Sequence, residues 1–222
     1  MDKLEQKDRE RLEKLSSTNV SDALDALGIS GATCGIRPLT ERWRKIVGPA
    51  VTLKMTTDDG TPQKTHLGMN AIASAQAGDV IVIDNSGRLD TSCWGGILAN
   101  AAKEKGVAGT VIDGCCRDLD DCIDVDYKVF ARGTVVCTAR GRVMEEYTNQ
   151  TILFGGVSVR PGDIVMGDSS GIVIIPKERM EEVLDKAEQL WQKEEAMIAE
   201  IRAGADILTV DAKYNYNKML KQ

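Results

Sequence analysis

The sequence predicts a single α/β domain whose second half is mostly β. A glycine turn, a helix, a second turn and a buried strand follow one another over residues 93–121, and short strand-like runs recur at close spacing after residue 130. Few crossover helices remain in that second half, so a simple doubly wound sheet fits poorly. A chain of 222 residues suits one domain, spanning 1–222, and can bury a sizeable core.

The first third of the chain predicts three helices and two strands. Helices are expected over residues 3–15, 20–27 and 62–77, and strands over 46–55 and 80–83. Cap-forming side chains at 16–19 precede the second helix. Pro62 suits the first turn of the third helix, because its ring presets the helical φ and its missing N–H is not needed there.

The central unit begins with a glycine pair. Gly95 and Gly96 open a helix whose apolar residues recur at helical spacing, and Gly106 ends it. The β-branched run at 109–112 is typical of a strand that is covered on both faces. This order of elements predicts a helix packed beside a buried strand.

Arg117 and Asp118 follow the buried strand after a short turn. In open α/β sheets, ligands collect outside the carboxyl ends of the strands. The N-terminus of the helix that opens at Gly95 and Gly96 offers free backbone N–H groups to an anion. The sequence therefore predicts a ligand site around Arg117 and Asp118.

The last part of the chain predicts short strands followed by a long helix. Strands are expected over 129–131, 134–138, 151–154, 157–159, 164–166 and 171–175, with a polar surface excursion at 139–150. The helix at 177–201 carries an apolar seam of the kind that packs on another helix or subunit, and Glu194 is its one charge. The tail at 204–222 either packs on a neighbouring subunit or frays; its apolar residues include Tyr216, Met219 and Leu220.

The composition excludes several classes of protein. A formal net charge of -6 argues against a partner held through nucleic-acid phosphates. No segment reaches the roughly 20 apolar residues that a membrane helix needs. The charged N-terminus has no apolar core of a signal peptide, so the expected compartment is the cytoplasm and the six cysteines are expected as free thiols. With one histidine, His66, a structural zinc site is not expected.

Four motifs together resemble the RraA-like family, which includes metal-dependent 4-hydroxy-4-methyl-2-oxoglutarate aldolases and oxaloacetate decarboxylases. They are KIVGPAVTLK at 45–54, GDVIVID at 78–84, WGGILANAAKEKGVAGTVIDGCCRD at 94–118 and FGGVSVRPGDIVMGDSSGIVIIP at 154–176. The resemblance implies a swivelling β/β/α fold and a homotrimer or pair of trimers with active sites between subunits. It implies a divalent cation, Mg²⁺ or Mn²⁺, and a small 2-oxo acid substrate. The composition, as given above, predicts no nucleic-acid or membrane partner.

The resemblance also implies roles for individual residues. Asp118 falls on the metal-binding Asp of the family, and Arg117 on the Arg that contacts the 2-oxo acid and stabilises developing negative charge. The backbone N–H groups of Gly95, Gly96, Ile97 and Leu98 would cradle the carboxylate. From the residues alone, Asp118 is more typical of a helix N-cap that pairs with Asp121. Asp121 itself is interpreted as solvated, with a supporting role at the site as the alternative.

One position departs from the family pattern. The family's aldolases usually carry an acid twenty-one positions before the Arg, where this chain has Gly96. Retro-aldol cleavage needs a base, whereas decarboxylation of oxaloacetate does not. The sequence therefore favours decarboxylation over aldol cleavage, unless a group other than an acid at position 96 acts as the base.

Two further expectations rest on the resemblance. Acids reach the active site from a neighbouring subunit in this family, and Glu194 is the candidate here, with an Arg partner across a subunit interface as the simpler alternative. The alternative function is that of a non-catalytic regulator that binds a ribonuclease. Regulators of that kind commonly lack the Asp after the Arg, which this chain keeps.

Overall fold

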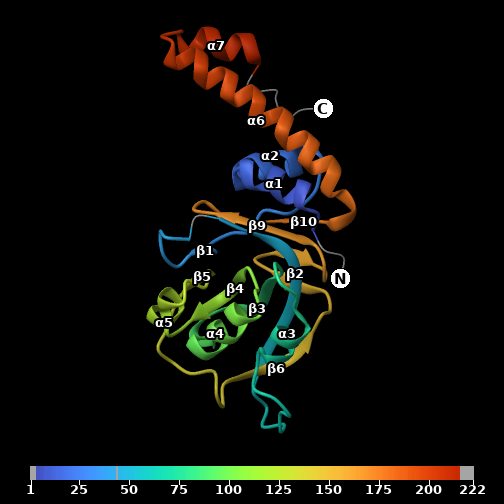
Figure 1. The fold of residues 1–222 in the computed structure, drawn as a ribbon, viewed down its shortest axis with the longest axis vertical. Coiled ribbons are helices and arrows are strands. Elements are labelled where there is room, and N and C mark those ends of the chain that lie inside the picture. Colours follow the sequence, from blue (N-terminus) through green and yellow to red (C-terminus); the bar gives the residue numbers. More distant parts are fainter. Residues whose placement is uncertain (1–3, 44, 216–222) are drawn as a thin grey trace.

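The computed structural model describes residues 4–43 and 45–215 (Figure 1). The helices are α1 (Gln6–Lys14), α2 (Ser17–Ala26), α3 (Met69–Ser74), α4 (Gly96–Glu104), α5 (Leu119–Asp124), α6 (Met180–Arg202) and α7 (Ile207–Tyr214), with a 3₁₀ turn at Lys177–Arg179. The strands are β1 (Arg37–Pro38), β2 (Lys45–Thr57), β3 (Val80–Trp94), β4 (Gly109–Cys116), β5 (Val129–Thr134), β6 (Val143–Thr148), β7 (Ile152–Phe154), β8 (Val157–Val159), β9 (Ile164–Asp168) and β10 (Gly171–Ile175).

The long strand β2 belongs to two layers. Residues 45–49 of β2 pair antiparallel with β9, which pairs in turn with β10. Residues 50–54 pair in parallel with β3, and the parallel layer continues through β4 to β5. The strand order is β1-β5-β4-β3-β2-β9-β10, with β6 paired to the far end of β2. This mixed α/β arrangement confirms the predicted fold class.

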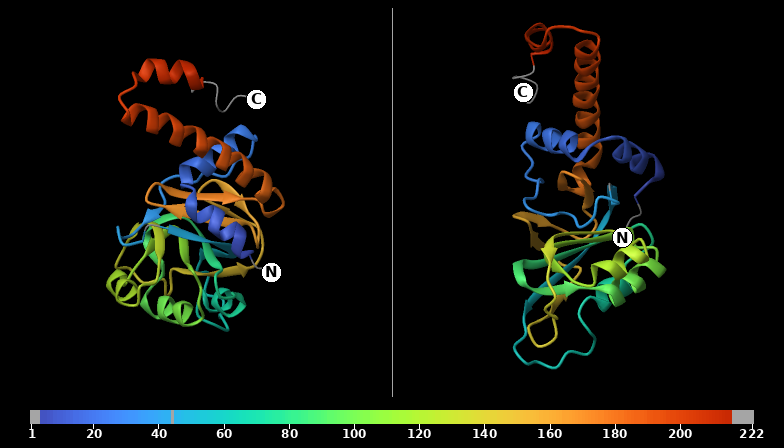
Figure 2. Two further views of the ribbon diagram at one scale, coloured as in Figure 1. Left: turned by 45° about the horizontal axis from the view of Figure 1, so that its top comes forward. Right: turned by 90° about the vertical axis from the view of Figure 1, so that its left-hand side faces the viewer.

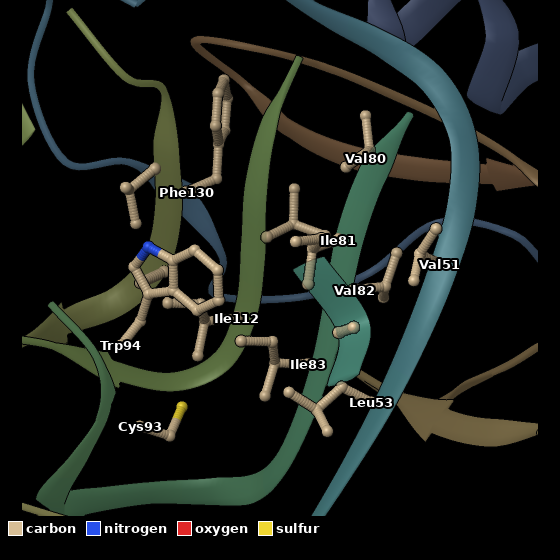
Figure 3. Packing of buried hydrophobic residues seen from close by; sticks show 14 of the residues in the cluster. Val51, Leu53, Val80, Ile81, Val82, Ile83, Cys93, Trp94, Ile112 and Phe130 are labelled. Carbon is tan, nitrogen blue, oxygen red and sulfur yellow. The ribbon is translucent and has the colours of Figure 1, made fainter. Parts of the chain in front are cut away.

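Helices cover each layer on its outer side (Figures 1 and 2). α3, α4 and α5 lie on the parallel layer, and α1, α2 and α6 lie on the β9–β10 layer. Two hydrophobic clusters follow from this division. The larger cluster includes Val82, Ile112, Trp94 and Phe130 and fills the parallel layer (Figure 3). The smaller joins α1, α2 and α6 to β9 and β10.

The predicted helix at 62–77 is wrong, because only Met69–Ser74 is helical. The chain just before α3 is bound to β6 instead, because the backbone N–H of Gly68 donates to Glu145 Oε2 at 3.2 Å. α3 begins only after Gly68, whose φ of 80° lies in the left-handed region.

Two predictions for the middle of the chain also fail. β5 ends at Thr134, so residues 135–138 are not a strand, and Val136 is almost fully exposed with no strand to pack on. The expected surface excursion at 139–150 contains β6, which pairs with β2. β6 is mostly half-buried and carries two glutamates in a row, so its residues show little of the alternation that is typical of a strand.

The predicted capping residues and the four strands after residue 150 are confirmed. Ser16 and Asn19 cap α2 reciprocally: the Asn19 N–H donates to Ser16 Oγ at 3.0 Å, and the Ser16 N–H donates to Asn19 Oδ1 at 3.1 Å. β7, β8, β9 and β10 lie where short strands are expected. Among the described helices, none combines the length and the apolar composition that crossing a membrane requires.

The seam on α6 packs along only part of its length. Leu184 and Ala187 are buried in the cluster with α2. Beyond them α6 extends away from the body of the protein, and α7 folds back along its end (Figures 1 and 2). Ile198 and Ile201 are exposed there. The tail residues Tyr216, Met219 and Leu220 lie outside the described part of the chain.

Candidate active site

Arg117 and Asp118 follow β4 directly, as the sequence predicts. The backbone N–H of Arg117 donates to the carbonyl of Trp94 at 3.0 Å, and Trp94 is the last residue of β3. The dipeptide is thus fixed where two parallel strands end and where α4 begins. This is the edge of the sheet at which α/β folds bind their ligands.

Asp118 occupies the position before α5, but its side chain does not cap that helix. Its backbone is left-handed, with φ 52° and ψ 45°. The carboxylate is directed instead toward α4: Oδ2 accepts a hydrogen bond from the N–H of Gly96 at 3.3 Å and lies 3.3 Å from Arg117 Nε. The capping interpretation, in which Asp118 pairs with Asp121, is therefore wrong.

The two glycines that open α4 allow two carboxylates to approach its backbone. A Cβ on Gly95 would lie 2.7 Å from Asp118 Oδ2. A Cβ on Gly96 would lie 2.3 Å from Asp121 Oδ2. Neither distance leaves room for a side chain, so both positions require glycine while these acids stay in place.

A cavity of about 280 Å³ opens beside this edge. Of the predicted substrate-binding residues, Gly95, Ile97, Leu98 and Arg117 line it, together with Asp118. Gly96 is absent from the lining, and its N–H group is bound to Asp118. The remaining wall is formed by His66, Leu67, Met69, Ser92, Cys93, Trp94, Thr138, Ala139 and Arg140.

His66 and Arg140 are cavity residues that the sequence analysis did not identify. His66 lies in the loop before α3 rather than in a helix, and Arg140 lies in the loop before β6. Among the ion pairs of the described residues, none joins Arg140 to a carboxylate. The cavity therefore presents two guanidinium groups and one carboxylate, a balance that favours an anionic ligand.

The pKa of His66 is lowered, first by its partial burial and then by the positive charges of Arg140 and Arg117. A lowered pKa keeps the imidazole neutral at pH 7. Since the unfolded chain then binds a proton more readily than the folded one, protonation of His66 destabilises the fold as the pH falls below its ordinary pKa.

The lowered pKa of His66 can be tested by an NMR titration of its imidazole ring. The chain has one histidine, so its imidazole resonances in a proton NMR titration belong to His66. We expect a midpoint below about 6.5, the ordinary value for histidine. Arg140→Ala should raise that midpoint, because it removes a positive charge, whereas Arg37→Ala, which lies outside the cavity, should not. An unchanged midpoint in Arg140→Ala would show that Arg140 does not face His66.

The side chains in the cavity that could bind a metal ion fit a Mg²⁺ or Mn²⁺ site. In the described residues no group of three or more His, Cys, Asp or Glu side chains is placed to hold an ion. Asp118 is the one carboxylate in the cavity lining, and its side chain is 37% exposed. A single hard oxygen donor fits Mg²⁺ or Mn²⁺, which keep several waters and bind substrate oxygens, and it does not fit a structural zinc site.

The thiols of Cys93 and Cys115 are not suited to nucleophilic chemistry. Burial raises the pKa of Cys93, which lines the cavity, and of Cys115. All six cysteines are free thiols, as expected. A raised pKa leaves little reactive thiolate at neutral pH.

Glu194 belongs to α6 and contacts Asn19 of α2. The helix α6 lies on the opposite side of the molecule from α4 and α5 (Figure 1). The Oε2 atom of Glu194 accepts a hydrogen bond from Asn19 Nδ2 at 2.6 Å, so its partner within the chain is an amide. Partial burial raises the pKa of Glu194, and the Asn19 hydrogen bond opposes that shift. One chain does not bring Glu194 to Arg117 and Asp118.

Comparison with known proteins identifies relatives over most of the chain. The family model for RraA-like proteins, described as Aldolase/RraA, matches residues 17–174. Protein DlpA of Legionella pneumophila is 32% identical over 94% of this chain, but the match spans only 34% of DlpA. A Halalkalibacterium halodurans protein named "Putative 4-hydroxy-4-methyl-2-oxoglutarate aldolase" is 36% identical over 82% of each chain.

Solved structures share the fold. An uncharacterized protein from Pseudomonas syringae pv. tomato aligns with a TM-score of 0.83 and 31% identity, covering 95% of this chain and 99% of its own. Streptomyces coelicolor RraAS2, described as an unusual member of the RNase ES inhibitor RraA protein family, aligns with a TM-score of 0.78 and 27% identity over 88% of this chain and 97% of its own.

Proposed function

This chain belongs to the RraA-like family, and from that membership we propose that it is a divalent-metal-dependent carbon–carbon lyase acting on small 2-oxo acids. The product would be pyruvate or a relative, formed by decarboxylation of oxaloacetate, by cleavage of 4-hydroxy-4-methyl-2-oxoglutarate, or by both. The observation that carries the proposal is the placement of Arg117 and Asp118 side by side in one cavity at the N-terminus of α4.

Each residue of the cavity has a proposed task. The Arg117 guanidinium provides paired N–H donors to the substrate carboxylate or to the enolate oxygen that forms when the carbon–carbon bond breaks. The N–H groups of Ile97 and Leu98, in the first turn of α4, add positive dipole on the same side. Asp118 would hold the divalent ion, and its hydrogen bond from Gly96 fixes the carboxylate. Such an ion supplies Lewis-acid stabilisation of the enolate charge.

The far wall of the cavity suits the rest of an anionic substrate. Leu67, Met69 and Ala139 provide an apolar surface for its carbon chain. Arg140 provides a second cationic group on the same cavity. These features support a substrate with a short carbon body and more than one negative charge.

Metal removal is the direct test. The protein, incubated with oxaloacetate and Mg²⁺ or Mn²⁺, should release pyruvate faster than a protein-free blank with the same metal. EDTA should abolish the difference, and excess Mg²⁺ or Mn²⁺ should restore it, because the cavity lining offers the ion one carboxylate and therefore holds it reversibly. The blank is essential because free metal ions also decarboxylate oxaloacetate. Protein-dependent release that persists in EDTA would contradict a metal-dependent mechanism.

A regulator of a ribonuclease is the second candidate, and the likeness to RraAS2 favours it. Such a protein would act by contact and would need no divalent ion. Absence of turnover on a panel of 2-oxo acids, together with inhibition of a ribonuclease E-type enzyme at equimolar protein, would support this alternative over the lyase.

We also propose that Glu194 acts in the site of a neighbouring copy within a homotrimer or a dimer of trimers. Glu194 lies on α6, away from Arg117 and Asp118 of the same chain. It can therefore take part in catalysis only at the site of another subunit. The exposed apolar residues Ile198 and Ile201 on the same helix support an interface there.

A further inference from the structure

Glu145 of β6 binds the start of α3, beside one wall of the cavity. Its Oε2 accepts a hydrogen bond from the backbone N–H of Gly68 at 3.2 Å. Its Oε1 accepts one from Asn70 Nδ2 at 2.9 Å and one from Thr148 Oγ1 at 2.6 Å. Because Thr148 belongs to the same strand, it fixes the Glu145 side chain on β6, and the other two bonds tie α3 to that strand. We call these three hydrogen bonds the Glu145 clamp.

The loop between β2 and α3, residues 58–68, is attached near β6 at both ends. At one end the N–H of Asp58 donates to the carbonyl of Arg142 at 3.0 Å, and at the other Glu145 binds Gly68. Most residues between these points are exposed, and the loop extends beyond the sheet beside β6 (Figure 1). The end of the loop that reaches the cavity is therefore the end that Glu145 holds.

Gly68 connects the Glu145 clamp to the cavity. A Cβ at this position would lie 3.3 Å from Leu98 Cδ1 and 3.4 Å from Trp94 Cζ3, so the Gly68 backbone packs closely against both side chains. Leu98 and Trp94 both line the cavity. A movement of Gly68 away from Glu145 would therefore change the shape of the cavity.

Two loops contribute charged or ionisable groups to the cavity on this side. His66 and Leu67 come from the loop that Glu145 holds, and Arg140 comes from the loop that leads into β6. The positive charge of Arg140 contributes to the lowered pKa of His66, so the two loops lie near each other. Since Glu145 ties the first loop to the strand that follows the second, it fixes the spacing between them.

A carboxylate suits this position because it only accepts hydrogen bonds. A backbone N–H, an amide N–H and a hydroxyl group all donate to Glu145. A glutamine would keep one accepting oxygen and would turn an NH₂ group toward at least one of these donors. Hydrogen bonds to an ionised acceptor are also stronger than those to a neutral one.

We propose that Glu145 is a positioning residue that holds the loop at 58–68 against the cavity and so sets the affinity for the end of the substrate remote from Arg117, which rests on the proposed lyase function. The hydrogen bonds that fix Arg117 and Asp118 go to β3 and α4 and not to this loop. Loss of the Glu145 clamp should therefore weaken substrate binding and spare the chemical step.

The kinetic test uses oxaloacetate with Mn²⁺. Glu145→Ala should raise KM by about tenfold or more, the effect of losing a hydrogen bond to a charged group, while kcat stays close to that of the unmodified protein. Inhibition by pyruvate, whose single carboxylate needs only Arg117, should be unchanged. Glu145→Gln should raise KM less than Glu145→Ala. Glu146→Gln, the same change on the neighbouring exposed acid of β6, should alter neither constant.

The NMR titration of His66 provides a readout that needs no turnover. In Glu145→Ala the midpoint should rise toward about 6.5, the ordinary value, because the ring leaves its partly buried place near Arg140 and Arg117. Loss of a negative charge by itself would lower the pKa of a histidine. A rise in the midpoint therefore reports movement of the ring.

Asn70→Ala tests the Glu145 clamp from the side of α3. It removes one donor and leaves the carboxylate in place, so it should raise KM in the same direction as Glu145→Ala but by less. In the Glu145→Ala background the same change should add nothing further, because the bond between the two side chains is already lost.

Three results would overturn the assignment. If KM and the His66 midpoint in Glu145→Ala both match the unmodified protein, the loop keeps its place without the clamp. A fall in kcat with KM unchanged would assign Glu145 to the chemical step. Equal effects of Glu145→Gln and Glu146→Gln would make the lost charge, and not the hydrogen bonds, the cause. If the unmodified protein turns over no 2-oxo acid, the lyase function fails, and the His66 midpoint alone decides whether Glu145 holds the loop.

Discussion

Asp118→Asn should reduce protein-dependent pyruvate release from oxaloacetate on the order of 10²- to 10³-fold. Stabilisation by a bound ion contributes several kcal/mol to reactions of this type, and each 1.36 kcal/mol is worth about tenfold in rate. Asp118 is the one carboxylate in the cavity lining, so the variant loses the group that would hold the ion. Calorimetry should show a parallel loss of Mn²⁺ binding.

Asparagine is the appropriate replacement because of the backbone at this position. With φ at 52°, Asp118 is left-handed, a conformation that Asn tolerates and that Ala adopts only with strain. The side chain caps nothing on α5 and is 37% exposed, so the melting temperature should change little. Asp120→Asn is the matched control for the lost charge. Full activity in Asp118→Asn would remove the basis of the proposed mechanism.

Gly48→Ala should be the most damaging single-methyl change in the framework, with a loss of about 3 kcal/mol in the free energy of unfolding, the upper part of the range for overpacked sites. The added Cβ would lie 2.2 Å from the carbonyl oxygen of Gly78 and 3.1 Å from Val80 Cγ2. A backbone carbonyl cannot rotate aside as a flexible side chain can, so β2 or the start of β3 must move.

Gly133→Ala in β5 is the matched control for this change. Its Cβ would meet only Cys115 Sγ, at an ordinary 3.9 Å. Since alanine is better tolerated than glycine within a strand, this variant should be as stable as the unmodified protein or slightly more so. Urea denaturation of the three proteins at one concentration measures the difference. A Gly48→Ala variant within about 0.5 kcal/mol of the unmodified protein, the usual range for a neutral substitution, would show that the two strands adjust without cost.

The sequence predicted the elements whose signals are local. The glycine pair, the helix at α4, the β-branched run and the charged dipeptide lie within 29 consecutive residues, 93–121, and the structure has them in that order. Arg117 and Asp118 could be placed because the end of a strand fixes the position of the next residues along the chain. The helix expected from Pro62 is shorter than predicted because the chain before α3 is bound to a distant strand, with the Gly68 N–H donating to Glu145 of β6.

The rest of the site could not be predicted from sequence because it depends on contacts between distant loops. His66 and Arg140 come from two loops that meet only after the sheet has formed. The adjacent glycines at 95 and 96 indicated a helix entry, but not that Asp118 and Asp121 approach them. One feature of the sequence could have suggested His66 as a site residue: it is the one histidine of the chain.

The division of β2 between two layers bears on the order in which the chain can acquire its structure during synthesis. The four parallel strands, together with Arg117 and Asp118, are encoded by the contiguous stretch 45–134, so this layer can assemble once that stretch has left the ribosome. The other layer joins residues 45–49 to residues 164–168, and its cluster joins Leu12 and Leu24 to Leu184. These pairings span well over one hundred residues, and such long closures are slow. We therefore expect the layer that carries Arg117 and Asp118 to form before the layer built from both ends of the chain.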